Sequence, residues 1–460
     1  MKRDRSTFLI DWLNSSERKP LVIRGARQVG KTWIIRELAQ SQHRQLIELN
    51  FEKRPDIQTL FNSNDPTEIL ANITTFTGHA IRPSESILFL DEIQVAPHLL
   101  AKLRWFAEDM PELPVIAAGS LLDFALAEHE FSMPVGRIGY LYLEPLSFEE
   151  FLDATKNHRL LDYIRNYAWN TDIPDAIHTQ LIRLIKEYLI VGGMPSAVLS
   201  WATKKDPSAL NQIQYDLLTT YREDFSKYKG RLSIGRLEDI MNSIPRQLGK
   251  KFVYSHVNSQ ASSVPLKQAL ELLAKARVCH CILSTSANGL PLGAETNSKF
   301  LKMILLDCGL CCISLGLSLH QLASISEIAF INNGAMAEQL AGQILRTINA
   351  AYVDPTLYYW HREKQNSSAE VDYIIQHENQ VIPVEVKAGT TGSLKSLREF
   401  VKEKKTSLAI RVNSDKPSIF IAQIADQTTS PLKYTLISLP FYLFGQVHRL
   451  IKKAKKIDKF

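Results

Sequence analysis

The sequence predicts an α/β protein that opens with a parallel sheet. A short β-type run at residues 21–24 is followed by a glycine-containing loop and then by the helical pattern of residues 33–39. Two further apolar runs, at residues 87–90 and 114–118, are continuous rather than alternating. Continuous apolar runs are typical of parallel strands that are covered on both faces. Together these observations indicate strands that alternate with helices over residues 1–146.

The loop after the first strand predicts a phosphate-binding site. Its two glycines let the backbone wrap a phosphate, and the start of the following helix directs backbone N–H groups and the positive end of its dipole toward it. In a Walker A loop of this spacing, the lysine reaches the β- and γ-phosphates and the threonine hydroxyl binds Mg²⁺. The residues predicted to bind ATP are Gly25, Ala26, Arg27, Gln28, Val29, Gly30, Lys31 and Thr32.

Asp91 and Glu92 follow the apolar run at 87–90 and form a Walker B signature. We expect Asp91 to hold Mg²⁺ through water and Glu92 to orient or deprotonate the attacking water. Ser120 and Asn50 also follow strands, and open α/β sheets place their ligands beside such carboxyl ends. Ser120 is a candidate γ-phosphate sensor, and Asn50 is a candidate hydrogen-bond partner that holds Glu92 inactive. Both residues are equally compatible with plain strand-end caps.

Composition places the chain among ordinary globular proteins. Its 460 residues correspond to about three domains at roughly 150 residues each. With 45% hydrophobic and 22% charged residues, it is neither wholly disordered nor of collagen or coiled-coil composition. A net charge of +6 is too small to predict nucleic-acid binding for the whole chain. The basic tail at 449–459 is compatible with phosphate contact or with a solvated helix end.

Cysteine usage and hydropathy indicate a cytoplasmic protein. The five cysteines are an odd number confined to residues 279–312, unlike a secreted disulfide framework. Their spacing is poor for zinc, and free cysteine also packs as a small buried hydrophobe. Asp11 comes too early for the apolar region of a signal peptide. The most apolar stretch, 303–319, is shorter than the ~20 residues that span a bilayer, so we expect no membrane segment.

An ordered set of motifs resembles a prokaryotic family of AAA-type ATP-binding proteins whose members join this core to an uncharacterised C-terminal domain. The resemblance covers nearly the whole chain and implies that Arg137 reads the γ-phosphate, either in cis or from a neighbouring subunit of a homo-oligomer. The alternative is a structural arginine that pairs with a carboxylate of the lid. The motifs lie at residues 25–32, 90–94, 118–122, 134–137, 144–148 and 191–195.

Residues 147–204 are predicted to form a helical lid, whose main helix ends at Gly192 because glycine closes helices and Pro195 cannot continue one. Residues 205–330 are predicted to form a winged-helix-like adaptor: two helical patterns, at 234–244 and 265–275, precede a strand at 277–284. Winged helices bind DNA or proteins, and both partners stay open.

Residues 331–460 hold a second candidate site. Two β-type runs, at 370–375 and 381–387, form a hairpin in which a turn at 377–380 sets Asp372 opposite Glu385. Two carboxylates directly opposed across a hairpin, with Cβ atoms about 5 Å apart, repel each other. A Mg²⁺ or Mn²⁺ ion between them would make the interaction attractive. Lys387 is placed to orient or activate the attacking water, and Glu338 adds a carboxylate from the helix at 336–348. Pro383 requires an edge strand or a bulge.

This Asp…Glu-x-Lys layout is typical of restriction-endonuclease-like folds and resembles the family's C-terminal domain. The expected architecture is therefore a P-loop NTPase core of AAA type (1–146), a helical lid (147–204), a winged-helix-like adaptor (205–330) and a nuclease-like domain (331–460). The expected function is a Mg²⁺-dependent ATPase coupled to the nuclease-like domain and acting on DNA. The alternative is a nucleotide-gated signalling or defence switch, directed at a protein, whose nuclease-like domain is not catalytic.

Overall fold

The computed structural model describes residues 1–120, 122, 134, 136–227, 233–317, 334–364, 367–389, 393–424 and 431–457. Leu121 and Val135 of the family motifs and Lys459 of the basic tail lie outside these residues. The chain divides into two compact units. The N-terminal unit contains Met1–Pro145 and two later segments, Lys275–Val278 and Asn349–Asp354, and the C-terminal unit contains the rest. No helix in the described part of the chain is long and apolar enough to cross a membrane.

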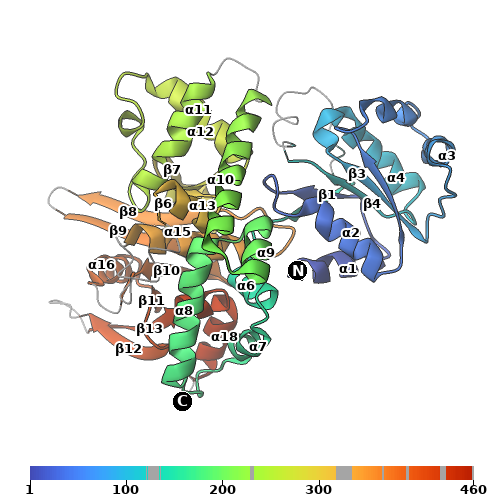
Figure 1. Cartoon of the computed structure of the whole chain (residues 1–460). Coiled ribbons are helices and arrows are strands. Elements are labelled where there is room, and N and C mark those ends of the chain that lie inside the picture. Colours follow the sequence, from blue (N-terminus) through green and yellow to red (C-terminus); the bar gives the residue numbers. More distant parts are fainter. Residues whose placement is uncertain are drawn as a thin grey trace. The chain divides into compact units, whose positions relative to one another are not determined.

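The N-terminal unit is built on a five-stranded sheet in the order β2-β3-β4-β1-β5, in which every pair of neighbours is parallel. Figure 1 shows helices on both faces of this sheet. The strands are β1 (Leu21–Arg24), β2 (Gln45–Asn50), β3 (Ser86–Asp91), β4 (Val115–Ala118) and β5 (Gly139–Tyr142), and the helices are α1 (Ser6–Asn14), α2 (Lys31–Ser41), α3 (Pro66–Thr77) and α4 (Leu103–Asp109).

The interior of this sheet confirms the prediction from the continuous apolar runs. All six residues of β3 and all four of β4 are buried, and one core cluster joins the strands to side chains of α3 and α4, including Ile69, Ile73, Leu103 and Phe106. Because strands in the middle of a parallel sheet have no solvated face, alternation is not needed. The carboxyl ends of β1, β2, β3 and β4 therefore meet at one edge.

The C-terminal unit begins with a series of helices. A capping box starts α6, since Ser147 Oγ accepts from Glu150 N and the Glu150 carboxylate accepts from Ser147 N. Gly192, with a φ of 77°, ends α8 as predicted. The helices up to residue 275 are α6 (Phe148–Ala154), α7 (His158–Asn166), α8 (Asp175–Val191), α9 (Pro195–Lys204), α10 (Pro207–Asp224), α11 (Ile234–Ser243) and α12 (Ser263–Lys275).

An eight-stranded mixed sheet forms the rest of this unit, in the order β12-β13-β11-β10-β9-β8-β6-β7. Its strands are β6 (Cys279–Thr285), β7 (Thr296–Leu305), β8 (Leu357–Lys364), β9 (Ser367–His377), β10 (Gln380–Val386), β11 (Leu408–Asn413), β12 (Ser418–Ile424) and β13 (Leu432–Pro440). Its helices are α13 (Cys308–Ser314), α15 (Gly334–Thr347), α16 (Lys395–Lys404), α17 (Phe441–Phe444) and α18 (Val447–Ile457).

The sheet runs across the expected boundary at residue 330. Strands β6 and β7, which the winged-helix prediction treats as part of a separate adaptor, pair with each other, and β6 also pairs in parallel with β8. The strand predicted to follow the two adaptor helices is thus part of the large sheet. The basic tail also has a structural role: Arg449 of α18 donates to the carbonyl oxygens of Tyr167 and Ile164.

The hairpin of the second candidate site has the predicted register. Val381 pairs with Gln376 and Val384 with Tyr373, so Asp372 and Glu385 are the next residues on the two strands. The expectation for Pro383 is wrong, because β10 is neither an edge strand nor bulged against β9. Pairing of β10 with β11 begins only at Val384. Pro383 therefore precedes the parallel ladder, and its missing N–H group removes no hydrogen bond from that ladder.

Candidate active site

In the loop between β1 and α2, the lysine side chain is bound by backbone carbonyl groups of the loop itself. Gly30 adopts a left-handed conformation with a φ of 98° at the start of α2, which favours glycine. The buried Lys31 donates from Nζ to the carbonyl oxygens of Gly25 and Ala26, at 3.0 and 2.9 Å. Burial lowers the pKa of Lys31 to about 8, although Glu92 and Asp91 oppose this shift. The loop therefore holds a partly desolvated cation where a phosphate would be bound.

Asp91 connects the magnesium-binding residues that the sequence predicts. Its Oδ2 accepts from Thr32 Oγ1 at 3.4 Å and from Asn50 Nδ2 at 3.0 Å. Asn50 was predicted to donate a hydrogen bond to Glu92, but it donates to Asp91 instead. The reason is the pairing of β2 with β3, which sets Asn50 directly opposite Asp91. Thr32 and Asp91 thus converge on one point, as a hydroxyl and a carboxylate must in order to share a Mg²⁺ ion and its waters.

Glu92 is the first residue after β3 and adopts a left-handed conformation with a φ of 54°. Non-glycine residues in this region are strained and cluster at functional sites. Its carboxylate accepts a hydrogen bond from Gln94 Nε2 at 2.6 Å. Gln94 belongs to the same motif but was not predicted to contact the site. Ser120 is buried two residues beyond β4, at the same edge of the sheet as Asp91.

Arg137 lies on the surface of the N-terminal unit. Its side chain is 53% exposed, and its Nε donates to Glu108 Oε1 at 2.7 Å. Arg104 pairs with the same carboxylate, from one turn earlier on α4. The hydrogen bond from Arg137, assisted by that from Arg104, lowers the pKa of Glu108, although desolvation of the carboxylate opposes this shift. The structure therefore gives Arg137 a carboxylate partner on α4, a helix of the N-terminal unit, and not in the predicted lid.

Two buried arginines near the loop were not predicted. Arg3 donates to the carbonyl oxygens of Val29, at 2.7 Å, and of Glu144, at 2.6 Å. Arg277 forms a bidentate pair with Asp354 at 2.9 and 3.0 Å and lies 3.8 Å from Glu144 Oε1. No sequence motif marks either arginine, and Arg277 is far from the loop along the chain. Their positions depend on tertiary structure alone.

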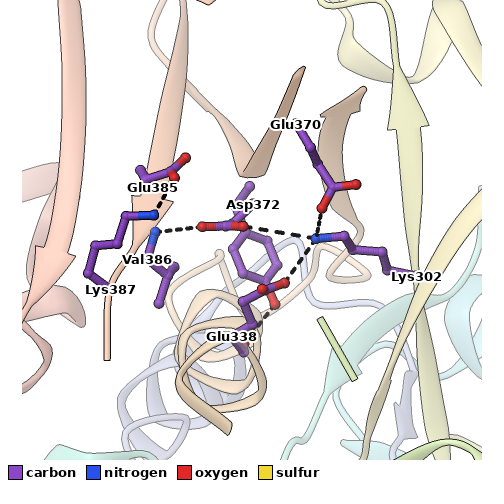
Figure 2. A network of polar contacts seen from close by, with 8 residues as sticks. Lys302, Glu338, Glu370, Asp372, Glu385, Val386 and Lys387 are labelled. Carbon is purple, nitrogen blue, oxygen red and sulfur yellow. Dashed lines mark hydrogen bonds and ion pairs between the residues drawn. The ribbon is translucent and has the colours of Figure 1, made fainter. Parts of the chain in front are cut away.

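The C-terminal carboxylates surround a lysine that sequence reasoning missed. Lys302, on β7, has a fully buried side chain (0% exposed). Its Nζ lies 2.5 Å from Glu370 Oε1, 3.0 Å from Glu338 Oε2 and 3.9 Å from Asp372 Oδ1. Figure 2 shows the ammonium group between these three side chains. A lysine on β7 gives no sequence signal, because its contacts with Glu370 and Asp372 of β9 depend on the tertiary arrangement of the sheet, in which β6 and β8 lie between the two strands.

The predicted hairpin residues form a second part of the same network. Asp372 Oδ2 accepts from Val386 N at 2.7 Å, and Lys387 Nζ donates to Glu385 Oε1 at 2.6 Å. Burial, together with the charge of Asp372, raises the pKa of both Glu338 and Glu385. Within the described residues, no group of three His, Cys, Asp or Glu side chains has an arrangement that could hold a metal ion.

Comparison with known proteins identifies the first part of the chain. Residues 17–152 match the AAA domain family. Residues 182–321 and 333–438 match two domains of unknown function, DUF8612 and DUF4143. No curated protein matches the chain. With the Walker A loop and the Walker B strand in place, the fold and the site define an AAA-type ATPase domain. The chain joins this domain to two domains that carry no assigned function.

Two solved structures resemble the chain at low identity. A Walker-type ATPase of Pyrococcus abyssi is 17% identical, with a TM-score of 0.43, over 68% of this chain and 96% of its own. The Orc1 protein of Aeropyrum pernix, solved in complex with DNA, is 11% identical, with a TM-score of 0.28, over 69% and 93%. Since both TM-scores lie below 0.5, the assignment rests on the AAA match and on the site geometry.

The pKa of Asp91 predicts how activity depends on pH. Burial, together with the charge of Glu92, raises this pKa to about 6. A protonated Asp91 cannot hold Mg²⁺, so kcat/KM for Mg²⁺–ATP should fall as the pH drops below about 6. The raised pKa has the opposite effect on folding: the contribution of Asp91 to stability is present at low pH and is lost as the pH rises through 6. A kcat/KM that is constant between pH 7 and pH 5 would contradict the role of Asp91.

Proposed function

We propose that this protein is an ATP-hydrolysing AAA-type switch that couples its nucleotide cycle to a nuclease-like C-terminal domain. In this proposal the Walker A residues bind ATP, Thr32 and Asp91 hold Mg²⁺, Glu92 activates water, and Ser120 senses the γ-phosphate. Mg²⁺ neutralises charge on the transferred phosphoryl group. The convergence of Thr32, Asn50 and Asp91 beside Lys31 supports this assignment.

The proposed coupling is supported by the chain segments that make up the N-terminal unit. Two short segments from the second half of the sequence, Lys275–Val278 and Asn349–Asp354, belong to it. They are joined by the Arg277–Asp354 pair, and Ala351 O accepts a hydrogen bond from Tyr142 N of β5. Along the chain, the first segment leads directly into β6, and the second connects α15 to β8.

The loop that binds phosphate is linked to these segments by a chain of contacts. Arg3 joins the carbonyl oxygen of Val29 to that of Glu144, and the Glu144 side chain lies beside Arg277. Arg277 also contributes to the electrostatic environment of Lys31. A change in the loop on ATP binding would therefore act on two segments whose continuations are neighbouring strands of the large sheet.

The order of elements in the C-terminal unit and the contacts of Lys302 support the proposal that the nuclease-like domain is not catalytic. Helix α15 precedes the antiparallel strands β8, β9 and β10, and α16 then leads to β11, which is parallel to β10. Cleavage would require Glu338, Asp372 and Glu385 to hold Mg²⁺ or Mn²⁺ while Lys387 activates water. Lys302 already neutralises part of this cluster, which favours the alternative of a switch without nuclease activity.

The partner is either DNA or a protein that binds the winged-helix-like segment, and one assay separates them. ATP turnover is measured in the full-length protein with and without DNA, with strand cleavage followed in the same tube. We expect Mg²⁺-dependent turnover and no cleavage. Stimulation by DNA that falls steeply with salt would identify DNA as the partner, whereas insensitivity to DNA favours a protein. Absence of Mg²⁺-dependent turnover under all these conditions would contradict the ATPase proposal.

Arg137 is proposed to act in trans, within a homo-oligomer. Its ion pair with Glu108 is exposed, and exposed pairs contribute only about 0–1 kcal/mol, so the guanidinium can leave it readily. We expect Arg137→Ala to lower kcat by about 10³-fold or more while changing ATP affinity little, because such an arginine stabilises transition-state charge.

Arg104→Ala is the matched control for Arg137→Ala, since it removes the other arginine from Glu108 and should leave kcat unchanged. If Arg137 acts in trans, turnover per subunit should also rise with protein concentration. Normal turnover of Arg137→Ala would show that the arginine only pairs with Glu108.

A further inference from the structure

Glu92 has a fixed backbone and a long side chain. Its backbone N donates to Asp91 Oδ1 at 3.1 Å, and its carbonyl oxygen accepts from Val95 N at 3.1 Å. These two bonds hold the residue in its left-handed conformation after β3, but they leave the side-chain torsions free. A group that takes a proton from water must be held within hydrogen-bond reach of that water. The carboxylate of Glu92 therefore needs a restraint of its own.

Gln94 provides this restraint. It lies in the short 3₁₀ helix Ile93–Val95, and its Nε2 donates to Glu92 Oε2 at 2.6 Å, as short as charge-assisted hydrogen bonds are. Burial lowers the pKa of Lys31, and of the neighbouring charges Glu92 opposes that shift most strongly, ahead of Asp91. Because such effects weaken with distance, the carboxylate is held close to the phosphate-binding loop and is not turned away from it.

The amide of Gln94 is oriented to bind Glu92, and its own oxygen is left without a partner. An amide has donors on its nitrogen and an acceptor on its oxygen, so only the nitrogen can face a carboxylate favourably. The oxygen, Oε1, is buried and has no hydrogen-bond partner among the described residues. Buried polar groups of native structures are nearly always satisfied, and an exception needs an explanation. A role in holding Glu92 explains this one.

Gly119 makes room for the same amide. A Cβ atom at position 119 would overlap Gln94 Oε1. Gly119 has no positive φ that would favour glycine, so space, and not backbone conformation, explains the glycine here. The overlapping atom is the end of a flexible side chain, which can move aside. Gly119→Ala would therefore displace the amide of Gln94 without changing Gln94 itself.

We propose that Gln94 is a positioning residue of the ATPase site: its amide directs the Glu92 carboxylate toward the attacking water, and Gly119 provides the space that the amide occupies. The inference rests on the proposed role of Glu92 in water activation and extends it to a residue that acts through Glu92. Loss of this contact should lower kcat and leave ATP affinity unchanged, because the position of Glu92 matters only when water attacks.

The test measures Mg²⁺–ATP turnover, binding of a fluorescent ATP analogue and melting temperature in the full-length protein. We expect Gln94→Ala to lower kcat by about 10–10²-fold, as expected for a misplaced catalytic group, with ATP affinity and melting temperature close to those of the wild type. Gly119→Ala should lower kcat in the same way. Val95→Ala is the matched control, since Val95 is an exposed residue of the same 3₁₀ helix, and it should retain the wild-type kcat.

Two double variants give readouts that a merely structural role would not change. Gly119→Ala/Gln94→Ala should be no slower than Gln94→Ala, because the overlap requires the amide. Glu92→Gln/Gln94→Ala should be no slower than Glu92→Gln, because Gln94 acts only through the carboxylate. If Gly119→Ala acted through the neighbouring Ser120 instead, its effect would add to that of Gln94→Ala and contradict the role of Gly119.

A wild-type kcat in Gln94→Ala would overturn the inference. So would an additive loss in Glu92→Gln/Gln94→Ala, because the effect of Gln94 would then not pass through Glu92. In both cases the wild type still hydrolyses ATP, so this inference fails alone. Absence of turnover in the wild type would instead overturn it together with the proposed ATPase function.

Discussion

Glu92→Gln should bind ATP normally and hydrolyse it about 10²–10³-fold more slowly than the wild type. Glu92 directly follows the strand that presents Asp91, and its carboxylate is held by Gln94. Glutamine preserves the size of the side chain but cannot accept a proton from water. The effect should therefore appear in kcat and leave ATP affinity intact. Rapid turnover in Glu92→Gln would assign water activation to another residue.

Lys31→Ala is the complementary variant, and it should lose ATP binding itself. Lys31 neutralises phosphate charge in the bound ground state, and alanine removes the buried cation of the loop. Binding of a fluorescent ATP analogue to Lys31→Ala and Glu92→Gln separates the two roles. Equal affinity of Lys31→Ala and the wild type would contradict the Walker A assignment.

Asp307→Ala should destabilise the C-terminal unit by several kcal/mol, because each buried donor that loses its acceptor costs about 1–3 kcal/mol. The buried Asp307 carboxylate accepts from Gly193 N at 2.6 Å, from Leu310 N at 3.0 Å and from Gln343 Nε2 at 3.2 Å. It therefore caps α13 and also anchors the glycine turn that ends α8. Alanine would leave all three donors buried without this acceptor.

The control for Asp307→Ala is Asp206→Ala. Asp206 is an exposed residue that caps α10 by accepting from Ser208 N, and its loss should cost only about 1 kcal/mol. Denaturant unfolding of the two variants gives the comparison. Equal losses of stability would show that the anchoring of the glycine turn contributes nothing beyond helix capping.

Local patterns were enough to predict the N-terminal site. The loop from Gly25 to Thr32 and the Asp91-Glu92 pair are contiguous in sequence, and parallel strands necessarily bring their carboxyl ends together. The hairpin register was also predictable, because a short turn fixes which residues of β9 and β10 face each other. The partner of Asn50 was missed because it depends on which two strands are neighbours.

The contacts that sequence reasoning missed join residues far apart in the chain. Lys302 reaches Glu370 only because β6 and β7 enter the same sheet as β8 and β9. Arg277 reaches Glu144 only because its segment belongs to the N-terminal unit. Neither residue differs locally from an ordinary surface cation. Such positions depend on tertiary topology, which the periodicity of a single sequence does not predict.

Coupling between the two units is tested most directly by hydrogen–deuterium exchange in Glu92→Gln with and without Mg²⁺–ATP, with Lys31→Ala as the control. The proposed switch predicts that ATP changes the exchange of the loop at residues 25–32, of residues 275–278 and 349–354, and of β6 and β8. Lys31→Ala should show none of these changes. A change confined to residues 1–145, with β6 and β8 unaffected, would contradict the claim that ATP controls the C-terminal domain.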